Sequence, residues 1–466
     1  MRDESVRAID FKSGDEVRFA SVRFYGRVAA KRSGLCSDRK VWQTTIRSKF
    51  YVIRYERFSD LIPCKRALLK GDSTVAEVIA FKKRDKPAEA PKPAPPPSTR
   101  FEALDILRGL FIIGMLLANN AGDWGHIYAP LDHAAWHGFT LTDMVFPGFM
   151  TCVGLSMTLS LGRRMQAGGK TALLVHSLRR AAILVGIGLF LNLLPQFDFE
   201  HWRLPGVLQR IGICYAIASC LVVVHSHKTV QGGLVLHGRA LAIWGVVLLV
   251  AYTVLLKYVP VPGGFGANQW DAVHSWPAWV DMQVLGVNHV WSGAKTYDPE
   301  GLLSSLPATA NILGGILMGL YINAKTPRNA WGGVAIIGVL LMILALVMDS
   351  YVPIIKKLWT PSFVLLSCGF AFAVLAVLMV VMDRLGFKTW AVPIKLYGTN
   401  AILVYVFAWL LSIALGISGA TGAATAWILA QVGDPYLMSF LYALGVLVIC
   451  GLFLVPFYIK RWFLKI

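Results

Sequence analysis

Charged residues are scarce in this sequence. Only 15% of the 466 residues are Asp, Glu, Lys or Arg, whereas 56% are hydrophobic and the mean hydropathy is +0.58. A soluble domain of this length would need a larger polar surface. The composition therefore excludes an ordinary soluble protein and predicts an all-α, polytopic membrane helical bundle, with the lipid bilayer as its immediate partner.

Acidic residues are scarcer still, since 26 Asp and Glu stand against 45 Lys and Arg. Residues 1–100 hold 23 Lys and Arg against 12 Asp and Glu, and the remaining 366 residues hold 22 against 14. The basic excess is therefore concentrated near the N-terminus. We expect no nucleic-acid partner.

Cysteine is also rare, and its placement excludes two kinds of framework. None of the seven cysteines shows a CxxC or Cys/His spacing, so neither a disulfide framework nor a structural zinc site is expected. The first hundred residues lack an uninterrupted apolar core. We therefore expect no signal peptide, and insertion should depend on the first transmembrane helix itself.

Residues 1–100 differ in character from the rest of the chain. They mix charges with scattered aromatic residues and end in the Pro/Ala/Lys-rich stretch 86–97, which is typical of an extended, solvated linker. We predict a basic, disordered tail over 1–100 and a transmembrane domain over 101–466. A small basic accessory module, or a mis-assigned translation start, remains an alternative for the tail.

Ten mostly apolar windows long enough to cross a bilayer follow Phe101. They cover 105–122, 139–161, 176–194, 207–225, 240–259, 301–323, 332–350, 362–382, 395–416 and 436–458. The connections on the N-terminal side of these spans hold fifteen Lys and Arg, and those on the opposite side hold five. The positive-inside rule then places both termini in the cytoplasm. The other connections would then face outward, into the periplasm if the source is a bacterium.

A polar stretch between the first two spans carries His126, His133 and His137. An imidazole at a membrane boundary is a candidate general base or nucleophile. His133 and His137 are four residues apart and could share a metal on a helix, but no third ligand follows, so we predict no metal. Asp143 either forms a capping box with Thr140 or orients His133 and stabilises its protonated form.

Charged residues also lie at the ends of other spans. Asp105 and Arg108 share a helix face; they form an anchoring ion pair, or Arg108 binds a phosphate-bearing ligand. Arg203, Gln209 and Arg210 lie near the outer end of the fourth span. Arg210 falls within the membrane and should have a carboxylate or ligand partner.

Four further positions have ordinary structural explanations beside functional ones. Asp298 and Glu300 precede the sixth span, and helix capping explains Asp298 better than Glu300. Trp359 and Asn400 have default roles as an interface aromatic residue and an interhelical hydrogen-bonding residue.

Together these motifs resemble the heparan-α-glucosaminide N-acetyltransferase family. The resemblance runs in order from about Phe101 to Ile466, and it rests on Leu104-Asp105-x-x-Arg108-Gly109, Asn119, His133-Ala134-x-Trp136-x-Gly138-x-Thr140-x-x-Asp143-x-Val145-Phe146-Pro147, Arg203-x-Pro205-Gly206-Val207-Leu208-Gln209-Arg210, Tyr297-Asp298-Pro299-Glu300-Gly301, Leu358-Trp359 and Asn400-x-Ile402-Leu403-Val404-Tyr405. The chain looks like the bacterial branch, because it lacks the long lumenal region and extra leading span of lysosomal members and its 260–300 loop is shorter.

The resemblance implies that cytoplasmic acetyl-CoA supplies an acetyl group to an amine or hydroxyl of a sugar or glycan at the outer face. His133 matches the family histidine and would act as base or acetyl carrier, Asn119 would donate a hydrogen bond to the thioester oxygen, and Asp143 would orient His133. The expected substrate and CoA contacts are Asp105, Arg108, Trp136, Arg203, Gln209, Arg210, Asp298, Glu300, Trp359 and Asn400. Arg108 and neighbouring cytoplasmic cations would hold the CoA phosphates.

Other functions stay open at this stage. An amino-sugar transporter would share the span count and the intramembrane charges. A structural subunit that binds a polysaccharide-modifying partner is a third possibility, and a homodimer is left open. The pyrophosphate loop of soluble acetyltransferases, Gln/Arg-x-x-Gly-x-Gly/Ala, is absent from the sequence.

Overall fold

The structure is a computed structural model that describes residues 29–32, 42–45, 101–228, 234–325 and 327–463. The chain divides into two units, Met1–Ser98 and Thr99–Ile466. In the first unit, strand β1 (Ala29–Arg32) pairs antiparallel with β2 (Trp42–Thr45). The disorder predicted for the remainder of 1–100 concerns residues outside the described ones, so it stays a prediction.

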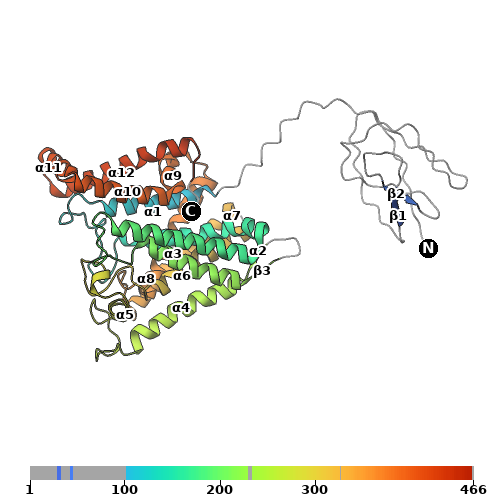
Figure 1. Cartoon of the computed structure of the whole chain (residues 1–466), viewed down its shortest axis with the longest axis horizontal. Coiled ribbons are helices and arrows are strands. Elements are labelled where there is room, and N and C mark those ends of the chain that lie inside the picture. Colours follow the sequence, from blue (N-terminus) through green and yellow to red (C-terminus); the bar gives the residue numbers. More distant parts are fainter. Residues whose placement is uncertain (1–28, 33–41, 46–100, 229–233, 326, 464–466) are drawn as a thin grey trace, which may run out of the picture. The chain divides into compact units, whose positions relative to one another are not determined.

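The second unit is helical, and its long helices run roughly along one direction (Figure 1). The helices are α1 Glu102–Asn119, α2 Val145–Leu193, α3 Val207–Val224, α4 Gly238–Tyr258, α5 Trp276–Val284, α6 Ser305–Lys325, α7 Pro327–Asp349, α8 Pro361–Met379, α9 Val392–Thr399, α10 Ala401–Ile417, α11 Ala420–Val432 and α12 Pro435–Ile459. Strands β3 (Ser226–Lys228) and β4 (Leu234–Leu236) pair between α3 and α4.

Seven helices among the described residues are long and apolar enough to cross a membrane, and the bent pair Thr389–Thr399 and Ala401–Ile417 raises the number to eight. The protein is therefore a multi-pass, mostly helical membrane protein. The count of ten stays a prediction, because it also includes α1 and the first part of α2. Helix α1 has only 18 residues, of which Glu102, Asp105 and Arg108 are charged.

The segment α2 consists of two helices that meet at a kink, in line with the two apolar windows expected there. It is 49 residues long and contains a single non-helical residue, Gly169, with φ of 80°. A positive φ is a conformation that glycine adopts without steric penalty. The first helix therefore ends at Gly169, and the second helix, Gly169–Leu193, is a candidate membrane span by itself.

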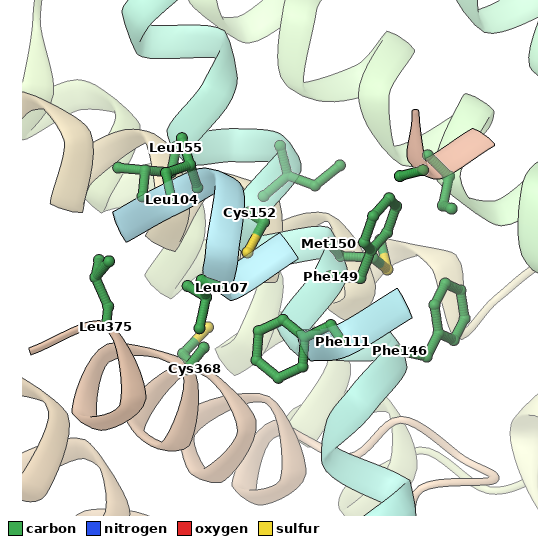
Figure 2. Packing of buried hydrophobic residues seen from close by; sticks show 14 of the residues in the cluster. Leu104, Leu107, Phe111, Phe146, Phe149, Met150, Cys152, Leu155, Cys368 and Leu375 are labelled. Carbon is green, nitrogen blue, oxygen red and sulfur yellow. The ribbon is translucent and has the colours of Figure 1, made fainter. Parts of the chain in front are cut away.

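Close backbone packing joins α2 to α6. A Cβ atom at Gly315 would overlap the carbonyl oxygen of Thr151, and one at Gly154 would overlap that of Ile312. Small residues at such crossings let two helices approach and gain van der Waals contact, which drives association in a bilayer. Buried apolar side chains of α1, α2 and α8 fill the space beside this crossing (Figure 2).

Both described ends of the second unit lie at the same end of the bundle. Helix α1 begins with Glu102, which binds Lys388 at 2.7 Å and Lys395, on α9, at 2.8 Å. At the break between α9 and α10, Asn400 donates a hydrogen bond to the carbonyl oxygen of Trp462. This arrangement fits an even number of membrane crossings.

Candidate functional site

Four connections meet at the opposite end of the bundle. The backbone N–H of Gly138 donates to the carbonyl oxygen of Ile354 at 2.9 Å, which joins the α1–α2 connection to the α7–α8 connection. Trp136 Nε1 donates to the carbonyl oxygen of Trp270 at 2.7 Å, and this contact adds the α4–α6 connection. The N–H of Leu204 donates to the carbonyl oxygen of His289, so the α2–α3 connection joins the same group.

His133 lies in the first of these connections and faces a buried carboxylate. Its Nδ1 atom is 2.8 Å from Asp143 Oδ1, and its side chain is 41% exposed while that of Asp143 is 1% exposed. A half-exposed imidazole held at one nitrogen by a carboxylate leaves its other nitrogen, Nε2, available to a substrate. This is the geometry of an oriented general base or nucleophile.

The local chain around Asp143 explains how its carboxylate is held. The backbone N–H groups of Ala134 and Thr140 donate to Asp143 Oδ2 at 3.1 and 3.0 Å, and the Thr140 hydroxyl donates to the same oxygen at 3.2 Å. Burial acts to raise the pKa of Asp143, but the hydrogen bond with His133 and the charge of Lys356 hold it well below its usual range. Asp143 therefore organises the turn and contacts His133, whereas among the described residues no side chain caps α2, which begins at Val145. A role of Asp143 in stabilising the protonated form of His133 stays a prediction.

Lys356 is the site residue that the sequence reasoning missed. Its Nζ atom lies 2.9 Å from His133 Nδ1 and 3.1 Å from Asp143 Oδ1, and its side chain is 16% exposed. Burial lowers the pKa of its ammonium group, an effect that Asp143 partly offsets. The sequence held one indication of Lys356: it and Lys357 are two of only five Lys and Arg residues in the connections predicted to face outward.

An aromatic wall adjoins this group. The ring of Trp136 meets that of Tyr297 edge to face with centroids 5.2 Å apart, and Lys357 lies over the Trp136 ring. Lys357 also donates to the carbonyl oxygen of Ala135 at 2.7 Å. Burial raises the pKa of Tyr297 to about 12, so the phenol stays neutral. Such aromatic faces suit the apolar face of a sugar ring.

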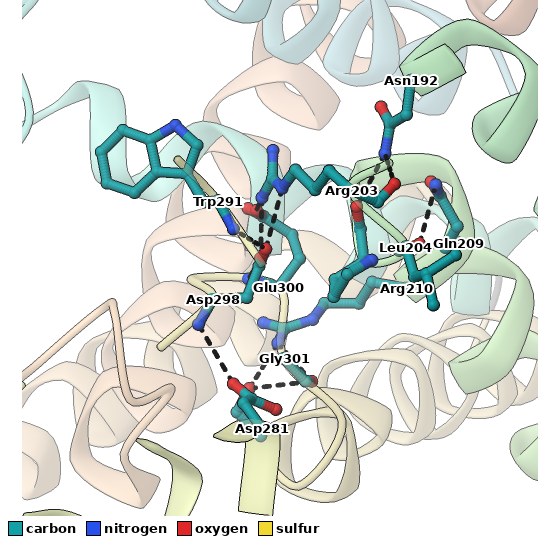
Figure 3. A network of polar contacts seen from close by, with 12 residues as sticks. Asn192, Arg203, Leu204, Gln209, Arg210, Asp281, Trp291, Asp298, Glu300 and Gly301 are labelled. Atoms are coloured by element: carbon teal, nitrogen blue, oxygen red, sulfur yellow. Dashed lines mark hydrogen bonds and ion pairs between the residues drawn. The ribbon is translucent and has the colours of Figure 1, made fainter. Parts of the chain in front are cut away.

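A second polar cluster forms around Arg203 (Figure 3). Its guanidinium makes a bidentate ion pair with Asp298, at 2.8 and 2.7 Å, and also binds Glu300 at 2.6 Å. Burial opposes the charge of Arg203, but the two carboxylates raise its pKa above the usual value. Asp298 contacts Arg203 and loop N–H groups, rather than capping α6, which begins at Ser305.

Arg210 is fully buried on α3, and its partners differ from those expected. Among the described residues it forms no ion pair; it donates to the carbonyl oxygen of Gly301 at 3.0 Å and to the hydroxyl of Ser304. Its guanidinium also lies over the ring of Trp359, 4.7 Å from the centroid. Neutral acceptors and an aromatic face therefore stand where a carboxylate was one expected partner. Nε and Nη1 of Arg210 have no hydrogen-bond partner among the described residues, and the other expected partner, a ligand, stays a prediction.

Trp359 is likewise fully buried, with φ of 53°, and its Nε1 donates to Asn311 Oδ1. Its default assignment as an interface aromatic residue is wrong, because α6, α8 and Arg210 enclose it. Gln209 donates to the carbonyl oxygen of Leu204 and lines a small hollow with Asn192 and Tyr405. Neither residue contacts His133 in the described part of the chain.

The remaining expected site residues lie elsewhere. Asn119 is exposed at the C-terminal end of α1, and the described hydrogen bonds do not join it to His133. Its neighbour Asn120 is buried and accepts a hydrogen bond from Ser412. Asp105 and Arg108 form the ion pair that their spacing predicts, at 2.7 Å, but they lie near the end of the bundle where α1 begins. Asn400, at the α9–α10 break, lies at the same end.

We next consider whether the described side chains could bind a metal ion. Within residues 101–228, 234–325 and 327–463, no group of three or more His, Cys, Asp or Glu side chains is arranged to hold a metal ion. His137 shares the loop of His133 but has an exposed position.

Comparison with known proteins connects this site to one family. Residues 100–244 match the family described as heparan-alpha-glucosaminide N-acetyltransferase, catalytic, and this region contains His133, Asp143, Arg203 and Arg210. The chain is 29% identical over 353 residues to the human heparan-alpha-glucosaminide N-acetyltransferase and 29% identical over 355 residues to the mouse protein. Each match covers 66% of this chain.

The matches cover 52% and 53% of the human and mouse proteins, so this chain spans about half the length of these relatives. The region that matches the catalytic family includes the His133–Asp143 pair, whereas Lys356 lies beyond it. The resemblance that the sequence motifs carry is confirmed: this chain is similar to the heparan-α-glucosaminide N-acetyltransferases, and its residues 100–244 match the model of their catalytic family.

Proposed function

We propose that this protein is a transmembrane acyltransferase that moves an acetyl group from acetyl-CoA to an amine or hydroxyl of a sugar or glycan at the outer face of a bacterial inner membrane. One observation carries the proposal: a half-exposed imidazole is held by a buried carboxylate within the region that matches an acetyltransferase catalytic family. The named relatives supply the acetyl-transfer chemistry, and the loop geometry supplies a residue that fits it.

The chemistry at His133 follows from the position of its proton. When Nδ1–H donates to Asp143, the lone pair of Nε2 faces outward. The acceptor nitrogen or oxygen then forms a bond to the thioester carbonyl carbon, the carbon–sulfur bond breaks, CoA leaves as thiolate, and the acceptor's proton passes to Nε2. A positioned base of this kind contributes about 10²- to 10⁴-fold to the rate.

A covalent route uses the same atoms. Nε2 attacks the thioester carbon and displaces CoA, and the acceptor then displaces the imidazole from the acetyl group. In either route Asp143 stabilises the positive imidazolium, and Asn119 is proposed to donate to the thioester oxygen as charge develops there. The proposed contacts of the acceptor are Trp136, Arg203, Gln209, Arg210, Asp298, Glu300 and Trp359.

The donor is proposed to enter from the end where α1 begins. Arg108 is one quarter exposed there and paired with Asp105, so it would meet a CoA phosphate through its remaining N–H groups. Asp105 and Asn400 lie at the same end and are also proposed to contact CoA. We propose ten spans with both termini in the cytoplasm, supported by the common location of Glu102 and Trp462.

An amino-sugar transporter is the second candidate, favoured by one observation. Helices α9 and α10 meet at a 73° bend, and broken helices are common at transporter binding sites. Buried charges occur in both classes, so they do not separate the two functions.

Purified protein in detergent, given labelled acetyl-CoA and acceptors ending in glucosamine, tests the proposal. We expect label to pass to the acceptor with release of one CoA thiol per acetyl group. Uptake of free amino sugar into proteoliposomes without acetyl-CoA, combined with no thiol release on any acceptor, would overturn the acyltransferase assignment in favour of transport.

A further inference from the structure

Three polar atoms form a closed triangle in the outward group of loops. His133 Nδ1 lies 2.8 Å from Asp143 Oδ1 and 2.9 Å from Lys356 Nζ, and Lys356 Nζ lies 3.1 Å from Asp143 Oδ1. Every edge is within hydrogen-bonding distance. The carboxylate is an acceptor and the ammonium group is a donor, so the single variable is whether Nδ1 carries a proton.

A neutral imidazole carries its proton on one nitrogen, and the two neighbours of Nδ1 favour opposite choices. A proton on Nδ1 satisfies Asp143 but sets an N–H group against the ammonium of Lys356. A proton on Nε2 leaves an Nδ1 lone pair that accepts from Lys356 but faces the carboxylate oxygen. The three edges cannot all be hydrogen bonds at the same time.

Other charged groups around the triangle do not replace Lys356. Asp143 Oδ2 is already occupied by Ala134 and Thr140. Asp132 accepts the backbone N–H of His133, not its ring. Glu300 acts on Lys356 only through its charge.

Lys357 belongs to the same loop as Lys356 but points elsewhere. Its ammonium donates to the carbonyl oxygen of Ala135 and lies over the Trp136 ring. The two adjacent lysines thus differ in one respect that matters here, which is contact with the imidazole.

We propose that Lys356 is a positioning residue that sets the tautomer of His133: it holds part of the population with the proton on Nε2, against the pull of Asp143 toward the Nδ1–H form. Its consequence for catalysis rests on the proposed function. In the mechanism proposed above only the Nδ1–H form has a free lone pair on Nε2, so Lys356 lowers the share of His133 that can act as the base.

The tautomer can be measured without any substrate. Protein labelled with ¹⁵N-histidine in detergent is observed by NMR at a pH where imidazole is neutral, and the His133 signals are identified by their loss in His133→Gln. Protonated and unprotonated ring nitrogens have well-separated shifts, so the averaged shift reports the tautomer populations. A structural contribution of Lys356 alone would not move this quantity.

We expect Lys356→Met to move the population toward the Nδ1–H form, and Asp143→Asn to move it toward the Nε2–H form, because the carboxylate that attracts the Nδ1 proton is lost. Lys356→Arg should stay near the wild-type value, since a guanidinium keeps the charge and the donors. Lys357→Met is the matched control and should leave the shifts unchanged. Lys356→Gln serves as a second variant if Lys356→Met fails to yield a monodisperse protein.

Two results would overturn the inference. One is an unchanged tautomer in both Lys356→Met and Lys356→Gln; the other is an equal change in Lys357→Met, which would indicate a general charge effect. Acetyl transfer is measured on the same samples. A tautomer change in a protein that transfers no acetyl group would count against the proposed function while supporting the role of Lys356.

Discussion

At the scale of single residues, His133 and His137 provide a natural comparison. Both lie in the α1–α2 connection, but of the two only His133 contacts Asp143 and Lys356 among the described hydrogen bonds. Asp143 holds the first imidazole in one orientation, whereas the described hydrogen bonds do not involve the ring of His137. Equal side-chain size with unequal contacts lets a mutation separate chemistry from loop stability.

We expect His133→Ala to lower acetyl-transfer turnover by about 10²-fold or more, the usual scale for loss of a positioned proton-transfer group. His137→Ala should cost far less. Turnover is measured as CoA thiol release with saturating acceptor. Comparable losses in the two variants would indicate a shared role for both imidazoles, and an active His133→Ala protein would direct attention to Asp143 or Glu300.

Asp281, on α5, supplies a pH-dependent contribution to stability. Burial raises its pKa to about 6, even though N–H groups of Asp298 and Leu302 donate to its carboxylate. The folded state therefore binds the proton more tightly than the unfolded state, whose pKa is near 3.8. This contribution is complete below pH 3.8 and is lost as the pH rises through about 6.

The expected slope is at most about 1.4 kcal/mol per pH unit between these two values. We predict that Asp281→Asn removes it, so the variant gains thermal stability relative to wild type as the pH is raised from 4.5 to 7.5. Melting in detergent at both pH values measures the change. Asp271→Asn is the control, since the pKa of Asp271 is lowered and its contribution changes only in more acidic solution. A difference that is independent of pH in Asp281→Asn would contradict the prediction.

At the scale of helices, the α2–α6 crossing depends on the absence of side chains. A methyl group at Gly315 would overlap the carbonyl oxygen of Thr151, a backbone atom that cannot move without shifting α2. Gly245, on α4, has no atom within 4 Å of the equivalent position. The two glycines thus differ in their packing although both lie within helices.

We expect Gly315→Ala to destabilise the protein by about 1–3 kcal/mol, the usual cost of overpacking. Gly245→Ala should be neutral or stabilising, since alanine is the better helix former by about 1 kcal/mol. Thermal unfolding in detergent compares the two variants with wild type. Equal melting temperatures for both variants would show that α2 and α6 can move apart to fit the added methyl group without a loss of stability.

Much of the helical architecture could be predicted because apolar length is a local property of the sequence. Every predicted apolar window overlaps a helix, but the place where the two helices of α2 meet depends on the conformation of one glycine, Gly169. The Asp143–His133 contact was foreseeable because ten residues separate the two in one loop. Lys356 is 223 residues from His133, so only the packing of distant loops brings them together.

At the scale of the whole helical unit, titratable groups are divided between its two ends. The end where α1 begins carries Glu102 with Lys388 and Lys395, while the opposite end carries His133 and the Arg203 cluster. Acetyl transfer across a membrane requires this kind of division, because donor and acceptor approach from different compartments. The orientation of the ends then decides whether the division suits the proposed reaction.

The positive-inside rule predicts that the His133 end faces outward. A cysteine at Ala135 should therefore react with a membrane-impermeant thiol reagent added to intact cells, and one at Gly168 should react only after the membrane is permeabilised. The native Cys36 and Cys64 are replaced by serine first, since both are in the basic tail and would obscure the cytoplasmic signal. Labelling at Gly168 in intact cells, with protection at Ala135, would invert the orientation. His133 would then face the cytoplasm, the same compartment as the donor, and transfer to an outward sugar would lose its physical basis.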